Sequence, residues 1–346
     1  MPAGISRSNN FDLLRLTFAS MVVLYHCYDL SGEPALRWVP LVCSAKLAVE
    51  GFFAMSGCLI VASYENSASF LDYIEKRARR ILPAYWAALV FTLIIGITFT
   101  ELPKIVFLRS ESTWKYALSN LVFLNFIHPD LPGLFTRNPV MSSVNGSLWT
   151  IKIEVMFYLF VPLLVFLCHK YGRWQTLVTV FIFSLIYKTI CEQLHHDSLA
   201  LQLPAQLGFF AIGALVYYYY PSFIKHEISV WIVALSSYAA YLFTDWMFFR
   251  VISISLLVMS VGLLLSVSKG RIKSGDFSYG TYVLHFPVIQ VLVAFGIFHA
   301  YPLASVVFTA LAVAILSFAS WHLVEKRFLS ISGTKKQLGR PAMIKA

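Results

Sequence analysis

Apolar residues dominate this chain in runs that are each long enough to cross a membrane as a helix. Ten such runs, each about 18–24 residues long, are separated by polar segments. A helix rises about 1.5 Å per residue, so about 20 apolar residues span the hydrocarbon core of a bilayer. The expected spans are 11–30, 41–63, 81–100, 148–169, 174–192, 200–220, 227–244, 247–268, 278–299 and 302–324. The pattern predicts an all-α fold, a polytopic membrane helical bundle of about ten transmembrane helices.

One apolar segment does not fit this pattern. Residues 115–128, which end in His128-Pro129-Asp130, are too few to span the membrane and are expected to lie re-entrant or interfacial. They fall within the longest loop, 101–147. No repeat, low-complexity tract or second domain interrupts the spans, so the sequence predicts one integral membrane domain over 1–328. A short basic cytoplasmic tail is expected over 329–346.

The composition agrees with a membrane protein. Of the 346 residues, 58% are hydrophobic and 13% are charged, whereas a soluble domain carries about 25% charged residues to face water. This balance argues against a cytosolic enzyme, a disordered protein and a nucleic-acid binder. The five cysteines form no CxxC pair, so we expect buried reduced thiols and no metal site.

The basic residues are distributed unevenly between the two sides of the membrane. Seventeen of the 27 Lys and Arg residues fall at or beside the two termini and in the loops on the same side, five fall in the opposite loops, and five lie inside or beside spans. Cytoplasmic loops of membrane proteins carry the excess of positive charge. We therefore expect both termini in the cytoplasm and the protein in the inner (cytoplasmic) membrane, with loop 101–147 facing outward.

Ionisable residues within spans are costly, and they are functional candidates for that reason. Arg15 lies near the cytoplasmic end of the first span, and His26 is expected about 16 Å further out. Two lysines and two carboxylates are expected at a similar depth, about 6–14 Å below the outer face, with Trp149 just above one pair. These four residues are Lys46, Glu50, Lys152 and Glu154. A histidine, carboxylates and lysines at one depth resemble an acid/base site in a water-accessible cavity.

Two further features lie toward the inner side. The cluster Lys76–Arg80 stands at the base of the third span, and His285 is expected about 10 Å into the ninth. A basic cluster there could receive an anionic cofactor. It could also be no more than a topology signal, and composition alone favours that interpretation.

Each candidate also has a plainer interpretation. A single histidine such as His26 is more often a satisfied polar core residue than a catalytic one. Lys152 and Glu154 could neutralise each other between helices. Trp149 and the run Tyr217–Tyr220 could be anchors at the membrane surface. The convergence of several such residues favours function.

Six short motifs occur in order from about residue 10 to residue 328, in register with the spans. They are Arg15-x10-His26; Glu50-Gly51-Phe52-Phe53-Ala54-Met55-Ser56-Gly57; Arg77-x-x-Arg80-Ile81-Leu82-Pro83-Ala84-Tyr85; Asn145-x-x-Leu148-Trp149-Thr150 with Glu154 and Tyr158; Gly280-x-Tyr282-x-Leu284-His285; and Glu325-Lys326 before Phe328. These motifs resemble those of the acyltransferase-3 family of integral membrane acyltransferases, with Arg327 where the family usually has proline.

The resemblance implies a ten-helix O-acyltransferase that moves an acyl group, commonly acetyl, at the membrane. The usual donor is cytoplasmic acetyl-CoA, a cosubstrate, and no metal is implied. The usual acceptors are sugar hydroxyls of a lipid-linked or polymeric glycan such as O-antigen or exopolysaccharide. Some members carry an extra hydrolase-like domain, and this sequence resembles a stand-alone member. Membrane lipids are the other expected partners, nucleic acid is not one, and the oligomeric state stays open.

Roles for single residues follow from this chemistry. Acyl transfer to an alcohol needs a base for the hydroxyl, and histidine suits that task because its pKa is near neutrality. His26 could deprotonate the acceptor or carry the acyl group on its imidazole, and Glu50 or Glu154 could orient it. Candidate donor-binding residues are Arg15, Arg77, Arg80 and Ser56, although Ser56-Gly57 could instead pack helices. Candidate acceptor-binding residues are Trp149, Lys152, Tyr158 and His285.

Three other functions are compatible with a polytopic membrane protein that has charges inside its spans. A secondary transporter also has about ten helices and intramembrane charges, but no matched pair of Gly/Pro-interrupted spans is visible. A membrane glycan polymerase would hold a lipid diphosphate with arginines in outward loops, whereas the basic cluster here faces inward. A non-enzymatic sensor is a third alternative.

Overall fold

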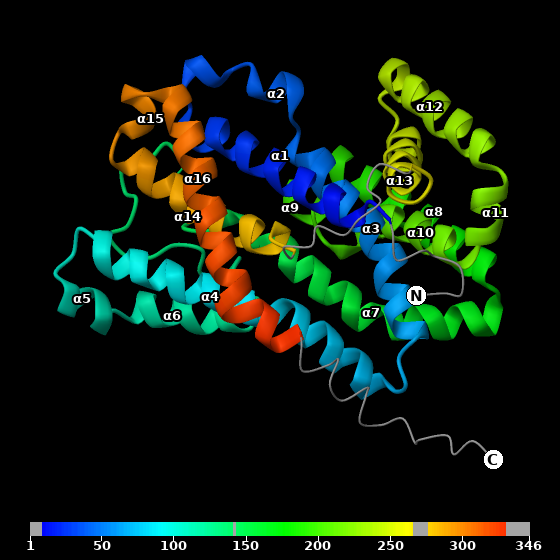
Figure 1. The fold of residues 1–346 in the computed structure, drawn as a ribbon, viewed down its shortest axis with the longest axis horizontal. Helices are drawn as coiled ribbons and strands as arrows, with labels where there is room; N and C mark the ends of the chain where they lie inside the picture. The colour runs from blue at the N-terminus through cyan, green and yellow to red at the C-terminus, as the bar shows by residue number, and fades with distance from the viewer. Residues whose placement is uncertain (1–8, 141–142, 266–275, 330–346) are drawn as a thin grey trace, which may run out of the picture. The chain divides into compact units, whose positions relative to one another are not determined.

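A computed structural model describes residues 9–140, 143–265 and 276–329. Every element in these ranges is helical, and each of the ten expected spans contains a helix (Figure 1). The long helices are α1 (Phe11–Ser31), α3 (Ala45–Glu65), α4 (Phe70–Phe99), α7 (Trp149–Tyr171), α8 (Arg173–Gln193), α10 (Leu203–Tyr218), α12 (Glu227–Thr244), α13 (Met247–Leu263), α14 (Ser278–Ala294) and α16 (Pro302–Ser320). Short elements connect them: η1 (Pro34–Leu36), α2 (Val39–Val42), α5 (Lys104–Arg109), α6 (Glu111–Leu121), η2 (Gly146–Leu148), α9 (Asp197–Ala200), α11 (Tyr220–Lys225), α15 (Ile297–Ala300) and the π-helix η3 (Trp321–Glu325).

Seven segments of the described chain are long and apolar enough to cross a membrane. They are Pro34–Glu65, Phe70–Phe99, Gly146–Tyr171, Arg173–Gln193, Asp197–Tyr218, Glu227–Thr244 and Pro302–Leu329. Two shorter apolar helices, Met247–Leu263 and Ser278–Ala294, accompany them, while α1 carries Asp12, Arg15 and Asp29 and is not among the seven. The prediction of an all-helical, polytopic membrane bundle is confirmed.

The chain divides into two compact units. Unit 1 consists of Met1–Met21, Ser44–Tyr73 and Thr150–Lys273, and unit 2 of Val22–Cys43, Ile74–Trp149 and Ser274–Ala346. Each unit is therefore assembled from segments that are distant in sequence. The sequence-based prediction had treated residues 1–328 as one domain. The expected tail over 329–346 lies outside the described residues except for Leu329.

Two boundaries differ most from the sequence-based expectation. Helix α4 begins at Phe70 rather than near 81, because Ser69 and Asp72 cap its start: the Asp72 amide donates to Ser69 Oγ (3.2 Å) and the Ala68 amide to Asp72 Oδ2 (2.9 Å). The basic cluster Lys76–Arg80 is thus part of the helix. Within loop 101–147, the helical segment is Glu111–Leu121, and residues 122–128 lie beyond its end.

Unit 1 is organised around α10, which packs against α3, α8 and α13. Two glycines set the closeness of one of these contacts. A Cβ on Gly57 would stand 2.0 Å from the Phe210 carbonyl oxygen, and one on Gly213 would stand 1.9 Å from that of Ala54. The backbones of α3 and α10 therefore touch, as small residues allow in membrane proteins. This gives Gly57 the helix-packing role that the sequence left open.

Prolines lie inside α4, α7 and α14, and in α7 and α14 a side chain binds the carbonyl that the proline leaves free. A proline has no N–H, so the carbonyl four residues earlier loses its helical partner. In unit 1, Pro162 of α7 frees the carbonyl of Tyr158, which accepts from Tyr73 Oη at 3.0 Å. In unit 2, Pro287 of α14 frees the carbonyl of Val283, which accepts from Asn145 Nδ2 at 2.9 Å. In a bilayer, where water is absent, such replacement donors are required.

Unit 2 has two apolar cores. One joins the second half of α1 to η1, α2 and α14 and contains Cys27, Leu30, Leu36, Val39, Phe286, Ile289, Leu292 and Phe298. The other anchors loop 101–147 on α4 and contains Leu89, Ile95, Phe107, Tyr116, Leu131, Leu134, Phe135 and Val144. The loop is thus a packed part of unit 2 that includes α5 and α6 (Figure 1).

The replacement donor on α4 gives a first prediction. Tyr73→Phe leaves the buried Tyr158 carbonyl without its hydroxyl donor and should destabilise the protein by about 1–3 kcal/mol. Pro162→Ala in the same chain supplies a backbone N–H to that carbonyl and should restore the melting temperature in detergent. If Tyr73→Phe melts like the wild type, the carbonyl does not depend on Tyr73.

Candidate functional site

Two histidines from distant segments meet in unit 2. His26 of α1 and His285 of α14 have nearly parallel rings, with centroids 5.0 Å apart and an interplanar angle of 11°. The ring nitrogens His26 Nδ1 and His285 Nε2 lie 2.7 Å apart, which is hydrogen-bond distance. The depths expected from the sequence differ for these two residues, because they assume straight helices whose ends lie level at the membrane surfaces. Their contact shows that this assumption was wrong for α1 and α14.

The partners of His285 determine where the hydrogens lie. His285 Nδ1 faces the carbonyl oxygens of Tyr282 (2.7 Å) and Thr281 (3.2 Å), so it must carry a hydrogen to donate. In the neutral ring, Nε2 is then an acceptor, and His26 Nδ1 must be the donor of the bond between the rings. His26 Nε2 is left with its lone pair. This is the tautomer that a base or a nucleophile needs.

The two histidine rings differ in their solvent exposure. His285 is fully buried, whereas His26 is half-buried. Phe286 meets the His26 ring edge to face, with centroids 5.2 Å apart. A Cβ on Gly146 would stand 2.8 Å from the Phe286 ring, so only glycine leaves room for that ring. Asn145, on the same motif, holds the α14 backbone at Val283.

Glu50 has partners other than an imidazole. Within unit 1 its carboxylate accepts from Arg250 Nε (3.0 and 3.1 Å) and Nη2 (2.7 Å), and Lys188 Nζ lies 4.0 Å away. Arg250 Nη1 also donates to Tyr241 Oη at 2.7 Å. The Glu50 side chain is 3% exposed, Lys188 5% and Arg250 11%. The Glu50 carboxylate thus pairs with the buried Arg250 and lies at the edge of ion-pair distance from the buried Lys188, which is a structural task.

The acidic and basic residues of α7 form separate contacts. Lys152 Nζ donates to Gln202 Oε1 at 2.8 Å, and Tyr158 Oη donates to Glu154 Oε1 at 2.5 Å. Trp149 is the first residue of α7 and is half-buried. Lys152 and Glu154, which could have neutralised each other, therefore each have a different partner.

The basic cluster at the start of α4 forms ion pairs. Arg80 pairs with Asp276, just before α14, and Arg79 with Glu75. Arg77 is half-buried beside them. In unit 1, Arg15 pairs with Asp12 at 2.8 Å, and Ser56 is half-buried on α3.

The π-helix η3 adds a carboxylate to unit 2 that the sequence did not assign. Glu325 is buried, accepts from Ser320 Oγ at 2.9 Å, and lies within electrostatic range of Arg80 and Asp276. π-Helical turns are frequent at functional sites.

The structure joins some predicted site residues and not others. It joins His26 to His285 and Glu154 to Tyr158. Glu50 belongs to unit 1 and His26 to unit 2. Sequence reasoning did not assign Asn145, Glu325, Lys188 or Arg250. The last two could have been found as ionisable residues within spans, because such residues demand a partner. Over the described ranges, no group of three or more His, Cys, Asp or Glu side chains is placed to hold a metal ion.

Comparison with known proteins decides the family. A family model described as an acyltransferase domain matches residues 8–322. The chain belongs to the acyltransferase-3 family.

Several curated proteins are similar along most of the acyltransferase chain. An O-acetyl transferase of Shigella phage Sf6 is 30% identical over 343 residues, covering 96% of this chain and 99% of that protein. Nodulation protein 10 of Rhizobium leguminosarum bv. viciae is 26% identical, with 92% of each chain covered. O-acetyltransferase OatA of Staphylococcus aureus (strain MRSA252) is 22% identical over 86% of this chain and 56% of its own. No solved structure matches.

Membership of this family makes the chain a multi-pass membrane O-acyltransferase. The comparison therefore favours acyl transfer over the polymerase, transporter and sensor alternatives.

The Glu50 network gives a second prediction. Glu50→Ala leaves Arg250 and Lys188 buried without their counter-charge, which should destabilise unit 1 by about 3–5 kcal/mol. The melting temperature of the purified protein should fall by several degrees. The matched control is Glu111→Ala, which breaks the exposed ion pair with Lys115 and should change little. A Glu50→Ala protein that is as stable as this control would refute the structural role.

Proposed function

We propose that this O-acyltransferase moves an acetyl group from cytoplasmic acetyl-CoA to a sugar hydroxyl of a cell-surface glycan, such as O-antigen or exopolysaccharide. The acceptor is lipid-linked or polymeric, the membrane is the inner (cytoplasmic) one, and both termini are cytoplasmic. The observation that supports the reaction best is the His26–His285 pair, because its hydrogen bonds leave a lone pair on the more accessible ring.

His26 Nε2 is the proposed base. It accepts the proton of the acceptor hydroxyl as that oxygen forms its bond to the acyl carbon. The bond between the acyl carbon and the CoA sulfur then breaks, and CoA leaves as the thiolate, which takes up a proton as the His26 ring returns to its neutral form. The alternative role, in which the same nitrogen carries the acyl group transiently, uses the same lone pair. Both need His26 Nδ1 to stay protonated, and the bond to His285 enforces this.

His285 is a positioning residue in this proposal rather than an acceptor-binding one. Both of its ring nitrogens are already used, by His26 on one side and by Tyr282 and Thr281 on the other. It thereby takes the orienting task that the sequence had offered to Glu50 or Glu154. Glu50 serves the ion network of unit 1, and Glu154 with Tyr158 stays a candidate for acceptor or proton contacts alongside Trp149 and Lys152.

The donor would be held by arginines. Guanidinium groups pair bidentately with phosphate, and CoA carries several phosphates. Arg77 and Arg80 of α4 lie in a cluster of four basic residues within five positions, which fits such a group. Arg15 and Ser56 belong to unit 1 and stay candidates for donor binding on the sequence motifs alone. Asp276 fixes the Arg80 guanidinium in place.

The proposed roles of the histidines give a third prediction. His26→Ala should abolish acetylation of the surface glycan, seen as the loss of one acetyl mass per modified sugar, while the protein still inserts and accumulates. His285→Leu should lower kcat by about 10²-fold or more, with a small change in KM. His285→Gln should recover most of that loss, because its amide oxygen can accept from His26 Nδ1.

The control variant is His196→Ala, an exposed histidine, which should be fully active. Normal acetylation by His26→Ala would refute the base assignment. Equal rates for His285→Leu and His285→Gln would show that His285 only fills space.

The proposed donor site gives a fourth prediction. Arg80→Asp should weaken acetyl-CoA binding about tenfold or more in calorimetric titrations, because a charge-assisted hydrogen bond to phosphate is lost. Exchanging the pair, Arg80→Asp with Asp276→Arg, should restore stability but not donor affinity. Arg109→Asp, on the exposed helix α5, is the control. Unchanged affinity in the Arg80 variant, with topology verified, would leave the cluster as a topology signal.

A further inference from the structure

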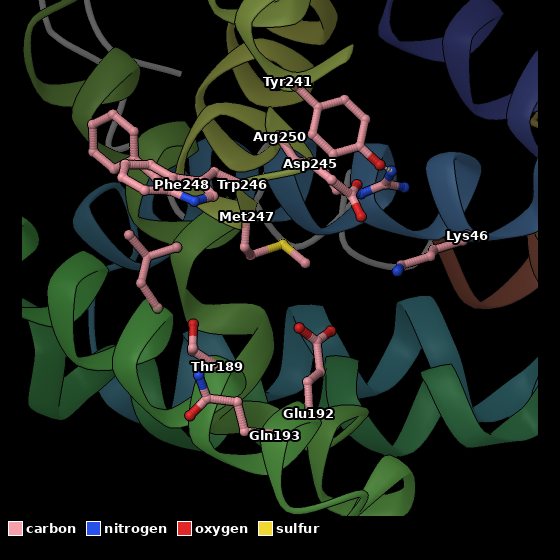
Figure 2. Close-up of a pocket in the computed structure, with 11 residues that line it drawn as sticks. Lys46, Thr189, Glu192, Gln193, Tyr241, Asp245, Trp246, Met247, Phe248 and Arg250 are labelled. Atoms are coloured by element: carbon pink, nitrogen blue, oxygen red, sulfur yellow. Dashed lines mark hydrogen bonds between the residues drawn. The ribbon is translucent and has the colours of Figure 1, made fainter. Parts of the chain in front are cut away.

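A pocket in unit 1 is lined by none of the residues assigned so far to the reaction. It has a volume of about 570 Å³ and is formed by the beginning of α3, the end of α8 and the turn between α12 and α13 (Figure 2). Its polar and aromatic lining includes Lys46, Glu192, Gln193, Asp245, Trp246 and Arg250. This volume falls within the range of small-ligand sites, about 300–1,000 Å³. Neither histidine of the pair lines it.

The turn between α12 and α13 is short, and its backbone has a defined conformation. Only Asp245 and Trp246 separate the two helices, and Asp245 has φ 52°, in the left-handed region that aspartate tolerates better than most residues. Its amide donates to the Tyr241 carbonyl at 2.8 Å. Trp246 stacks on Phe249, with centroids 6.2 Å apart and rings 15° from parallel. The Trp246 side chain is nevertheless 67% exposed and lines the pocket, so part of the indole is accessible to a ligand.

Arg250 is held rigidly at this turn and is not a spare cation. Its guanidinium donates to Glu50 and to Tyr241, so its hydrogen-bonding capacity is largely used inside the protein. It fixes α13 to α3 and to α12 and so keeps the pocket open. The groups available to a ligand are thus the others.

Those other groups are a mixed set of donors and acceptors. Within the described part of the chain, the side chains of Lys46, Glu192, Gln193 and Asp245 make no hydrogen bond or ion pair to protein. Figure 2 shows Lys46 and Glu192 toward one end of the pocket, Trp246 and Phe248 toward the other, and Met247 between them. One cation faces two carboxylates, so the set does not favour an anion.

We infer that this pocket binds a neutral sugar unit of the acceptor glycan. A sugar hydroxyl both donates and accepts, so it suits carboxylates and an ammonium or amide group in one cavity. The C–H face of a sugar ring is apolar and can pack on the accessible part of the indole, as apolar surfaces do. The inference rests on the proposed function: a sugar unit other than the reacting one would contribute binding energy here and orient the acceptor.

Direct binding tests the inference without requiring catalysis. The probe is a set of oligosaccharides released from the surface glycan of the bacterium that expresses the protein, with their acetyl groups removed by mild alkali. These oligosaccharides would be titrated against the full-length protein in nanodiscs. Trp246→Ala and Glu192→Gln should each raise the Kd at least about tenfold, the size expected for a buried anchor contact. The acceptor KM should rise in parallel, with kcat and the donor KM unchanged.

The control variants lie on α12, at residues that do not line the pocket. Phe243→Ala removes a 91% exposed aromatic side chain, and Glu227→Gln neutralises an exposed carboxylate at the other end of α12. Both should bind like the wild type. Unchanged Kd in both pocket variants overturns the inference, even if His26→Ala confirms the reaction.

Two other outcomes are informative. Saccharide binding that needs Trp246 and Glu192, in a protein that acetylates no glycan, would support the pocket and refute the proposed function. In the other, no saccharide binds, and phosphatidylethanolamine raises the melting temperature of the wild type but not of variants at Lys46 and Glu192. That result would overturn the inference in favour of a lipid head group.

Discussion

Inside a bilayer, every backbone carbonyl needs a donor from the protein itself, and this requirement organises both units of the chain. Pro162 and Pro287 each remove one helical N–H, and each freed carbonyl binds a side chain from another segment. The cost of an unsatisfied carbonyl in hydrocarbon is several kcal/mol, so these bonds fix which segment packs where. In unit 2, the donor Asn145 belongs to the segment that also supports Phe286. The segment of α14 that carries His285 is therefore held in place by a hydrogen bond to its own backbone.

The histidine pair depends on that arrangement. His285 lies two residues before Pro287, and its Nδ1 donates to carbonyls of its own helix. A buried ring with two fixed partners loses little further freedom when substrate binds, so it can hold the His26 ring at low entropic cost. The same pair needs no charged residue for its orientation. This explains how Glu50 can be committed to Arg250 and Lys188.

The helical architecture could be predicted from the sequence, because ten apolar runs of spanning length leave few alternatives. The residues that carry charge or polarity within spans could also be identified, including His26, His285 and Glu50. Their partners could not. Helix tilt, stagger and packing decide whether α1 contacts α14 and whether Glu50 contacts Arg250. A hydropathy pattern contains no information about these three properties. Straight-helix depths placed the two histidines at different levels for that reason. The start of α4 was also missed, since a capping box on a polar segment gives no hydropathy signal.

The contact of Gly57 and Gly213 with opposing backbone has a mechanical consequence. Two helices that touch through side chains can slide, because rotamers adjust as the surfaces move. Where the main chains meet directly, no rotamer is available to absorb a displacement, and even a small shift drives an oxygen against a Cα. Helices α3 and α10 should therefore move as a single rigid lever. Any opening of unit 1 that admits a bulky polymer must come from the elements around this lever, such as the α12–α13 hairpin, and not from within it.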